Sequence, residues 1–388
     1  MALAAQASHI AKQLRSKVRR WPFMIAGMGP VVAQLACGQV RELPSQKMPA
    51  AQVEQAQRDV VFLNYRFKDG KTLPELRLHF VTLGHTHTNA QGDVDNAILL
   101  LHWTNASSLA LLTPEYQAAL FAPGAPLDVS HYFVIIPDDI GHGQSSKPSD
   151  ELKARFPHYT YGDMVDLQHK VITESLGIKH LHAIIGMSMG CMNAWQWAED
   201  FPDAMDGIMP IACFPGPITG RNLLWRRMLI DGIRSDPAWL NGNYEKQPPS
   251  AFQGSMLARM MIDGVPALQQ EVPNWQAADS IIQGVRAQSG IDANDLLYAF
   301  ESSRDFDGEP GLPRIKTKVF ALNFADDEFY RDSLQTLQRD AQVLPEKQLV
   351  IRPIIKGSHG HLSIAHPALW KQQVETFMAW IKDETRVQ

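Results

Sequence analysis

A serine between two glycines is the strongest chemical signal in this sequence. Gly186-Met-Ser-Met-Gly190 follows the apolar run 181–185 and precedes residues 191–199, which have helical composition. A strand, a tight turn and a helix in this order form a nucleophile elbow, in which a serine hydroxyl stands clear of the sheet. The N-terminus of the helix would favour the negative charge of an oxyanion. We therefore predict that Ser188 is a nucleophile rather than an incidental residue of a strand-to-helix turn.

A nucleophilic serine needs a base that accepts its proton, and two histidines stand where such a base is expected. Residues 349–354 have the composition of a strand and are followed by His359-Gly-His361. In folds with a nucleophile elbow the chain order is serine, acid and histidine, each directly after a strand. We predict His361 as the base and keep His359 as the alternative. A solvated loop residue is the other interpretation of either histidine.

A carboxylate must orient this base, and an acidic cluster follows the preceding strand. Residues 319–323 are predicted as that strand, and Asp326, Asp327 and Glu328 come shortly after it. We predict Asp327 as the acid, with Asp326 second and Glu328 third. The carboxylates that are not used would cap the helix that follows.

Two backbone N–H groups must stabilise the oxyanion. Met189 directly follows the nucleophile and would supply one of them. The other is expected from the loop after the buried strand 97–101, where Thr104 is the predicted donor and Trp103 the alternative. Residues 138–145 contain a G-x-G but lack the spacing of a phosphate-binding loop, so we expect them to shape the site instead.

The composition excludes several classes of function. The 388 residues are 45% hydrophobic and 20% charged, which is typical of a globular protein. A net charge of −5 provides no basic surface for nucleic acid. The three cysteines, Cys37, Cys191 and Cys213, have no metal-type spacing, and from their odd number we expect no disulfide framework. We predict neither a metal site nor a resident cofactor.

The first residues have the pattern of a secretory signal. Residues 1–20 are basic, residues 21–36 are uncharged and mostly apolar, and Ala36-Cys-Gly38 supplies small residues for a cleavage site. The apolar run is too short for a stable membrane span. We predict that residues 1–38 direct export, which makes the protein periplasmic or secreted. The alternative is a cytoplasmic enzyme with an amphipathic extension. Residues 39–57 are predicted as a polar linker.

Strands and helices alternate along the rest of the chain, which predicts an α/β fold with a doubly wound, mostly parallel sheet. Residues 59–67 and 75–84 would form two antiparallel edge strands. Residues 215–309 mix tryptophan, methionine, proline and polar residues without strand alternation. We predict that this segment is a helical cap inserted into a sheet domain formed by residues 58–214 and 310–388.

Three segments resemble a known family. The elbow with its helix, Gly186-Met-Ser-Met-Gly-Cys-Met-Asn-Ala-Trp-Gln-Trp-Ala198, resembles that of homoserine O-acetyltransferases and their α/β-hydrolase relatives. Arg234-Ser-Asp-Pro-Ala-Trp-Leu-Asn-Gly-Asn-Tyr244 and Ala258-Arg259 are similar to the family's cap signature. The resemblance runs from about Asp59 to the C-terminus.

The resemblance implies an α/β-hydrolase fold in which Ser188, Asp327 and His361 form the catalytic set. It also implies a possible homodimer, and acetyl-coenzyme A as the acyl donor of true acetyltransferases. We take three further residues of the cap and the oxyanion loop as candidate substrate-binding residues: Arg259, Tyr244 and Trp103.

Two departures favour the hydrolase relatives over the acetyltransferases. Met187 stands where the acetyltransferases have a glycine before the nucleophile, and residues 293–307 look more like the hydrolases. A secretory signal also disagrees with acetyl-coenzyme A, a cytoplasmic metabolite. We therefore predict a hydrolase of small acyl esters that acts through an acyl-enzyme without a cofactor. An O-acyltransferase with an acyl-coenzyme A donor and a catalytically silent binding protein on the same fold are the alternatives.

Overall fold

The computed structural model describes residues 55–287, 290–329 and 334–382. The predicted signal segment 1–38 lies outside these residues, as does the predicted linker 39–57 apart from its last three residues, which belong to the first strand. None of the helices in the described ranges combines the length and the apolar character that crossing a bilayer requires.

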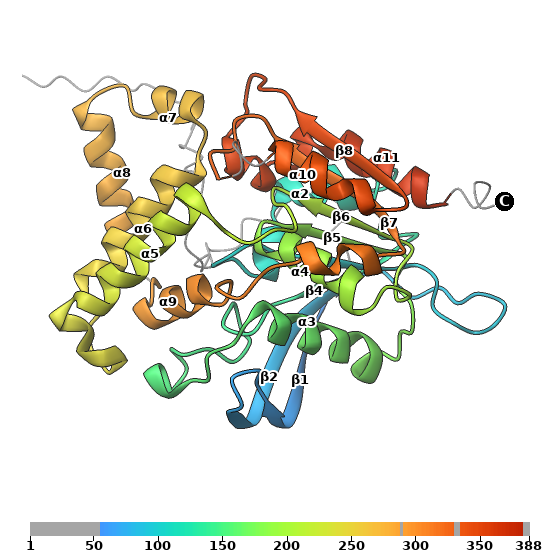
Figure 1. Cartoon of the computed structure of the whole chain (residues 1–388), viewed down its shortest axis with the longest axis horizontal. Helices are drawn as coiled ribbons and strands as arrows, with labels where there is room; N and C mark the ends of the chain where they lie inside the picture. The colour runs from blue at the N-terminus through green and yellow to red at the C-terminus, as the bar shows by residue number, and fades with distance from the viewer. Residues whose placement is uncertain (1–54, 288–289, 330–333, 383–388) are drawn as a thin grey trace, which may run out of the picture. The chain divides into compact units, whose positions relative to one another are not determined.

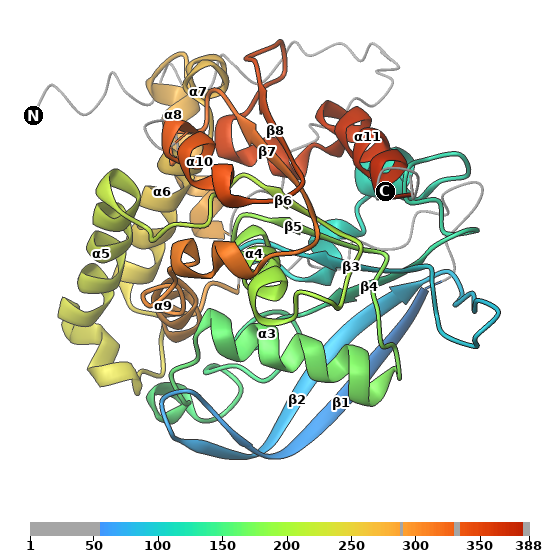
Figure 2. The same ribbon diagram turned by 45° about the vertical axis from the view of Figure 1, so that its right-hand side comes forward.

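One sheet organises the molecule, and its strands lie in the order β1-β2-β4-β3-β5-β6-β7-β8 (Figures 1 and 2). β1 pairs antiparallel with β2, and β2 pairs antiparallel with β4, whereas the other neighbours are parallel. This confirms the predicted mostly parallel, doubly wound sheet with its antiparallel edge. The strands are β1 (Gln55–Arg66), β2 (Thr72–Leu83), β3 (Ala97–Leu101), β4 (Phe133–Pro137), β5 (Ala183–Met187), β6 (Gly207–Ile211), β7 (Lys318–Phe324) and β8 (Lys347–Arg352).

Helices cover both faces of this sheet, so its central strands are buried throughout. Along β5, Ile184 packs into one apolar cluster, whereas Ile185 and Met187 pack into the other, because successive side chains point to opposite faces. The first cluster includes side chains of α3 and α4, and the second those of α2 and α11. These helices are α2 (Pro114–Tyr116), α3 (Tyr161–Lys170), α4 (Met189–Asp200) and α11 (Lys371–Lys382). A further helix, α10 (Leu334–Asp340), follows β7 and precedes β8 in the chain.

Between β6 and β7 the described residues form helices and connecting segments without a strand (Figure 1). Side chains of α5, α6 and α9 belong to the same continuous apolar cluster as those of α3 and α4. The predicted division into a cap at 215–309 and a separate sheet domain therefore stays a prediction, although the helices lie inside the predicted cap. They are α5 (Gly220–Ser235), α6 (Pro249–Ile262), α7 (Val265–Glu271), α8 (Trp275–Ala287) and α9 (Ala293–Glu301).

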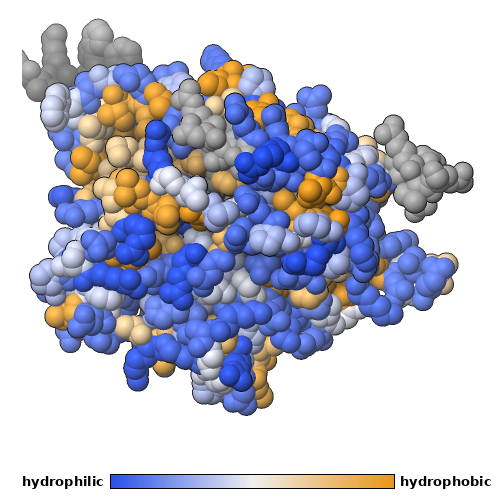
Figure 3. All heavy atoms as spheres, viewed as in Figure 1, coloured by the Kyte–Doolittle hydropathy of each residue, from blue (hydrophilic) through white to orange (hydrophobic). Residues whose placement is uncertain are grey.

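These helices expose an apolar surface (Figure 3). Its largest members are half or more exposed: Leu224, Met228, Met260, Val265 and Trp275. Exposed apolar patches on a protein are often contact surfaces. The homodimer implied by the sequence resemblance stays a prediction.

Cys191 and Cys213 form a disulfide, which corrects our expectation of no disulfide framework. Cys191 lies in the first turn of α4, and Cys213 follows β6. The parallel pairing of β5 with β6 brings the two residues together, with their Cα atoms 6.0 Å apart and both side chains buried. The expectation was wrong because an odd number of cysteines excludes only complete pairing, not a single bridge.

Glu199, in the last turn of α4, carries a carboxyl group that is buried away from water. It packs against Gly308 and Gly311, and the guanidinium of Arg314 lies 4.0 Å away. Burial raises the pKa of Glu199 to about 8, and the charge of Asp200 adds to this effect. The folded protein therefore holds a proton, between about pH 4.5 and 8, that the unfolded chain releases.

The free energy of unfolding should consequently decrease as the pH rises through this window. We expect a decrease of roughly 2–4 kcal/mol between pH 5 and 8.5 that is absent in Glu199→Gln. Urea unfolding of both proteins at several pH values measures it. Glu174→Gln is the matched control, because Glu174 is 60% exposed. Parallel pH profiles of the wild type and Glu199→Gln would contradict the prediction.

Candidate active site

Ser188 lies at the turn between β5 and α4, as the sequence predicted. Its backbone has φ +53° and ψ −107°, a conformation that residues other than glycine rarely adopt. The N–H of Ser188 donates a hydrogen bond of 2.9 Å to the carbonyl of Ile211 at the end of β6. The strained turn is therefore anchored to the neighbouring strand.

The two glycines of the elbow are required by close backbone approaches. A Cβ atom on Gly186 would overlap the carbonyl of Gly190, and a Cβ on Gly190 would lie 2.6 Å from the carbonyl oxygen of Leu101 and 2.7 Å from that of His102. The N–H of Gly190 donates to the His102 carbonyl at 3.0 Å. These contacts hold the elbow against the loop that follows β3.

The structure brings Ser188, His361 and Asp327 into one hydrogen-bonded chain. Nε2 of His361 lies 2.8 Å from Oγ of Ser188, and Nδ1 of His361 lies 2.7 Å from Oδ2 of Asp327. All three side chains are buried. The N–H of Phe329 donates to the other oxygen of Asp327 at 2.9 Å. A carboxylate at Nδ1 favours the tautomer that carries its proton there, which leaves Nε2 to accept the serine proton.

The alternatives considered for the acid and the base have other partners. Asp326 accepts a hydrogen bond of 2.9 Å from the N–H of Gly360, the residue directly before His361. Nδ1 of His359 lies 3.3 Å from the carboxylate of Asp263, at the end of α6. Glu328 forms an ion pair of 2.7 Å with Arg221. The geometry thus favours Asp327 and His361 over these three residues.

The expected oxyanion donors lie in the elbow and in the loop that the elbow contacts. Met189 is the first residue of α4, and an N–H in the first turn of a helix has no helical carbonyl to bond. Thr104 and Trp103 lie in the loop that Gly190 contacts through the carbonyl of His102. The assignment of Met189 and Thr104 as oxyanion donors stays a prediction.

His102, which the sequence motifs do not single out, connects this loop to the residues that follow β4. Its Nδ1 lies 2.8 Å from the Trp103 carbonyl, and its Nε2 accepts a hydrogen bond of 3.2 Å from the N–H of Asp139. Burial raises the pKa of the Asp139 carboxyl, which accepts a hydrogen bond from Gln168. The signal that could have indicated His102 is its position, directly after the buried strand β3.

Contacts among residues of the segment 215–309 account for two of the candidate substrate-binding residues. Arg259 lies 3.4 Å from the carboxylate of Asp263. The hydroxyl of Tyr244 donates to Asp292 at 2.7 Å. Trp103 is partly buried against the second apolar cluster. A role of Arg259, Tyr244 or Trp103 in substrate binding stays a prediction.

Across residues 55–287, 290–329 and 334–382, no three histidine, cysteine, aspartate or glutamate side chains are arranged to hold a metal ion. The predicted absence of a resident cofactor is not tested by this observation. The chemistry available at the site is that of the buried serine, histidine and carboxylate.

Known proteins with related sequences include both acyltransferases and hydrolases. A model of the alpha/beta hydrolase fold family matches residues 97–256. The chain is 31% identical to a homoserine O-acetyltransferase of Zymomonas mobilis, over 61% of this chain and 71% of that protein. It is 26% identical to an ethyl acetate hydrolase of Pseudomonas veronii, over 76% of this chain and 86% of that protein.

The fold has a close counterpart among solved structures. An acetylester hydrolase from Corynebacterium glutamicum superposes with a TM-score of 0.71. Its sequence is 21% identical, and the match covers 84% of this chain and 96% of the other. At this identity the likeness concerns the fold alone.

Because the backbone of Gly190 lies so close to Leu101 and His102, we expect one added methyl group at this position to lower the stability of the protein. Gly190→Ala should lower the free energy of unfolding by about 1–3 kcal/mol, because the added Cβ meets two backbone carbonyls that cannot move aside. Gly284→Ala is the matched control, since Gly284 lies in α8 with open space around it and should change stability by less than about 1 kcal/mol. Urea unfolding measures both; a neutral Gly190→Ala would contradict the predicted clash.

Proposed function

Since the chain belongs to the homoserine O-acetyltransferase-like family of the α/β-hydrolase superfamily, we propose that it is a serine hydrolase of small acyl esters. One observation carries the proposal: Nε2 of His361 lies 2.8 Å from the Ser188 hydroxyl, while its Nδ1 lies 2.7 Å from Asp327. This is the hydrogen-bond order that an activated serine requires.

In the proposed reaction, Oγ of Ser188 attacks the ester carbonyl carbon while His361 accepts the hydroxyl proton. Asp327 stabilises the resulting imidazolium, and the N–H groups of Met189 and Thr104 hold the oxyanion. The tetrahedral intermediate collapses, and the alcohol leaves with the proton from His361. Water then gives a proton to His361 and attacks the carbonyl carbon of the acyl-enzyme. When this second intermediate collapses, His361 returns the proton to Oγ of Ser188 and the carboxylic acid leaves.

The relatives support a second candidate, an O-acyltransferase. The same acyl-enzyme would form from an acyl-coenzyme A donor, and an amino-acid hydroxyl would replace water as the acceptor. The similarity to homoserine O-acetyltransferases favours this reaction, whereas the similarity to the ethyl acetate hydrolase favours water.

The disulfide supports the hydrolase. Bridges such as Cys191–Cys213 persist mainly in oxidising compartments, which agrees with our proposal that the protein is exported to the periplasm or secreted. Acyl-coenzyme A is a cytoplasmic metabolite, so an exported enzyme would lack this donor.

Product analysis separates the two candidates. We expect the purified protein to convert ethyl acetate to free acetate, with no O-acetylhomoserine formed when homoserine is added. Ser188→Ala should lower the rate by at least about 10⁴-fold, since it removes the nucleophile. Mass spectrometry identifies the products. Preferential transfer of the acetyl group to homoserine would instead establish the transferase.

The roles of the two neighbouring aspartates can be tested separately. Asp327→Asn should lower kcat by about 10³–10⁴-fold, because an amide at Nδ1 favours the wrong tautomer of the base. Asp326→Asn is the matched control: its amide oxygen still accepts the Gly360 N–H, so its effect should stay below about 10-fold. Equal losses in the two variants would argue against Asp327 as the orienting acid.

A further inference from the structure

The turn that carries His361 is held on one side by the segment that leaves α6. Gly360 has φ +57°, and a Cβ on it would lie 2.8 Å from both the Cα and the nitrogen of Gly264. A Cβ on Gly264 would in turn lie 2.7 Å from the nitrogen of Gly360. The two backbones therefore touch without an intervening side chain, and the position of Gly264 limits where the residue directly before His361 can lie.

A second aspartate–histidine pair lies beside this contact. Nδ1 of His359 lies 3.3 Å from Oδ1 of Asp263, the residue directly before Gly264. A carboxylate only accepts hydrogen bonds, so the His359 nitrogen is the donor. The same oxygen accepts the N–H of Gly264 at 2.9 Å. Asp263 therefore connects the end of α6 to the histidine turn through a side chain as well as through the backbone.

Asp263 is buried, and Arg259 compensates its charge. The residue is 4% exposed. Nη1 of Arg259 lies 3.4 Å from Oδ2 of Asp263, and Nη2 of Arg259 lies 2.5 Å from Glu271, at the end of α7. A buried carboxylate is costly unless it is paired and hydrogen-bonded. Arg259, Gly264 and His359 supply these partners, so the carboxylate of Asp263 has a fixed position.

On its other side, the turn is bonded to the residue beside the proposed acid. Oδ2 of Asp326 accepts the N–H of Gly360 at 2.9 Å, and Asp327 directly follows Asp326. Gly360 is thus held between the turn after β7 and the end of α6. Misplacement of a reacting group by about 1 Å can lower a rate by about 10²-fold. Each of the two supports of the turn therefore affects how well His361 can act as a base.

We propose that Asp263 is a positioning residue for the base His361 and that it acts through His359. The proposal rests on the proposed ester hydrolysis, and it adds a residue of the segment between β6 and β7 to the site. The pair with His359 and the backbone contact at Gly360 keep Nε2 of His361 at 2.8 Å from the Ser188 hydroxyl.

Removal of the Asp263 carboxylate should therefore slow turnover and leave substrate binding unchanged. Asp263→Ala should lower kcat for ethyl acetate by about 10–100-fold and change KM by less than about 3-fold, since only the base is misplaced. Asp263→Asn keeps an oxygen that accepts the same N–H groups, so its kcat should stay within about 5-fold of the wild type. Both variants are assayed well below their unfolding temperatures. An unchanged kcat in Asp263→Ala, or a loss confined to KM, would overturn the proposal.

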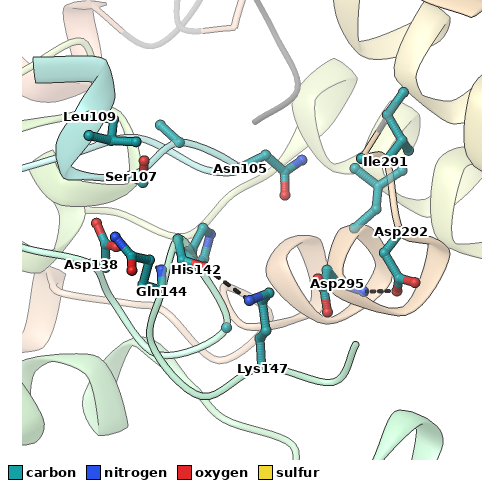
Figure 4. A pocket seen from close by; sticks show the side chains of 15 residues that line it. Asn105, Ser107, Leu109, Asp138, His142, Gln144, Lys147, Ile291, Asp292 and Asp295 are labelled. Atoms are coloured by element: carbon teal, nitrogen blue, oxygen red, sulfur yellow. Dashed lines mark hydrogen bonds between the residues drawn. The ribbon is translucent and has the colours of Figure 1, made fainter. Parts of the chain in front are cut away.

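An aspartate elsewhere in the same helical segment provides the matched control. Asp295 in α9 lines a cavity of about 290 Å³ next to the loop after β3 (Figure 4). It accepts hydrogen bonds from the N–H of Ser149 at 2.9 Å and from its hydroxyl at 2.6 Å, which link α9 to the loop after β4. Asp295→Ala should change kcat by less than about 3-fold, because these bonds support a different loop. Equal losses of kcat in the two alanine variants would overturn the specific role of Asp263.

The same pair can be removed from the histidine turn. The side chain of His359 is 33% exposed, so the fold should tolerate His359→Ala. This substitution should lower kcat by about 10-fold. The double variant should be at most about 2-fold slower than Asp263→Ala, because both substitutions remove one contact. Losses that multiply in the double variant would overturn the proposed path through His359.

Labelling of Ser188 distinguishes failure of this proposal from failure of the proposed hydrolysis. A fluorophosphonate reacts with a serine that a base activates, and it needs neither an ester nor an acceptor. By mass spectrometry, Asp263→Ala should react at least about 10-fold more slowly than the wild type, and Asp295→Ala at the wild-type rate. If no ester is hydrolysed but this order is found, the role of Asp263 stands and the hydrolysis is wrong. Equal rates in Asp263→Ala and the wild type, or a wild type that does not react, would overturn this role whatever the activity.

Discussion

The backbone of the elbow approaches the end of β3 so closely that only glycine fits at position 190, and the turn folds back on itself so tightly that only glycine fits at position 186. The contact with β3 fixes the loop that follows β3 relative to Ser188, and the Gly190 N–H bond to the His102 carbonyl reinforces it. The positive φ of Ser188 costs about 1–3 kcal/mol of strain. The buried strands on either side of β5 supply the packing that keeps this conformation in place.

The other two members of the hydrogen-bonded chain depend on the same sheet. Parallel pairing of β7 with β8 places the turns that carry Asp327 and His361 at one edge. The N–H of Phe329 then fixes the Asp327 carboxylate, and burial removes competing water. Ser188, His361 and Asp327 are thus already oriented, so little reorganisation would be needed if charge developed on them. Such preorganisation is a main source of electrostatic stabilisation in enzymes. The geometry thus belongs to the fold rather than to flexible side chains.

Much of this arrangement could be predicted because it follows from local patterns. Apolar runs identified the strands, and the glycines around Ser188 identified the elbow. What depends on tertiary contacts could not be predicted: the disulfide results from the pairing of β5 with β6, and the contact of Asp263 with His359 results from the packing of the end of α6 against the turn that carries His361. The sequence can only rank Asp326, Asp327 and Glu328 as partners of the histidine, because the conformation of the turn after β7 decides which carboxylate reaches His361.

The end of α6 has an evolutionary consequence. A Cβ on Gly264 would lie 2.7 Å from the N–H nitrogen of Gly360, and the neighbouring Asp263 contacts His359. The segment that leaves α6 therefore packs directly against the turn that carries His361. A lineage that acquires a new helical segment between β6 and β7 by recombination must inherit a matching histidine turn with it. The shape of this segment and the position of His361 would then diverge together, not as independent traits.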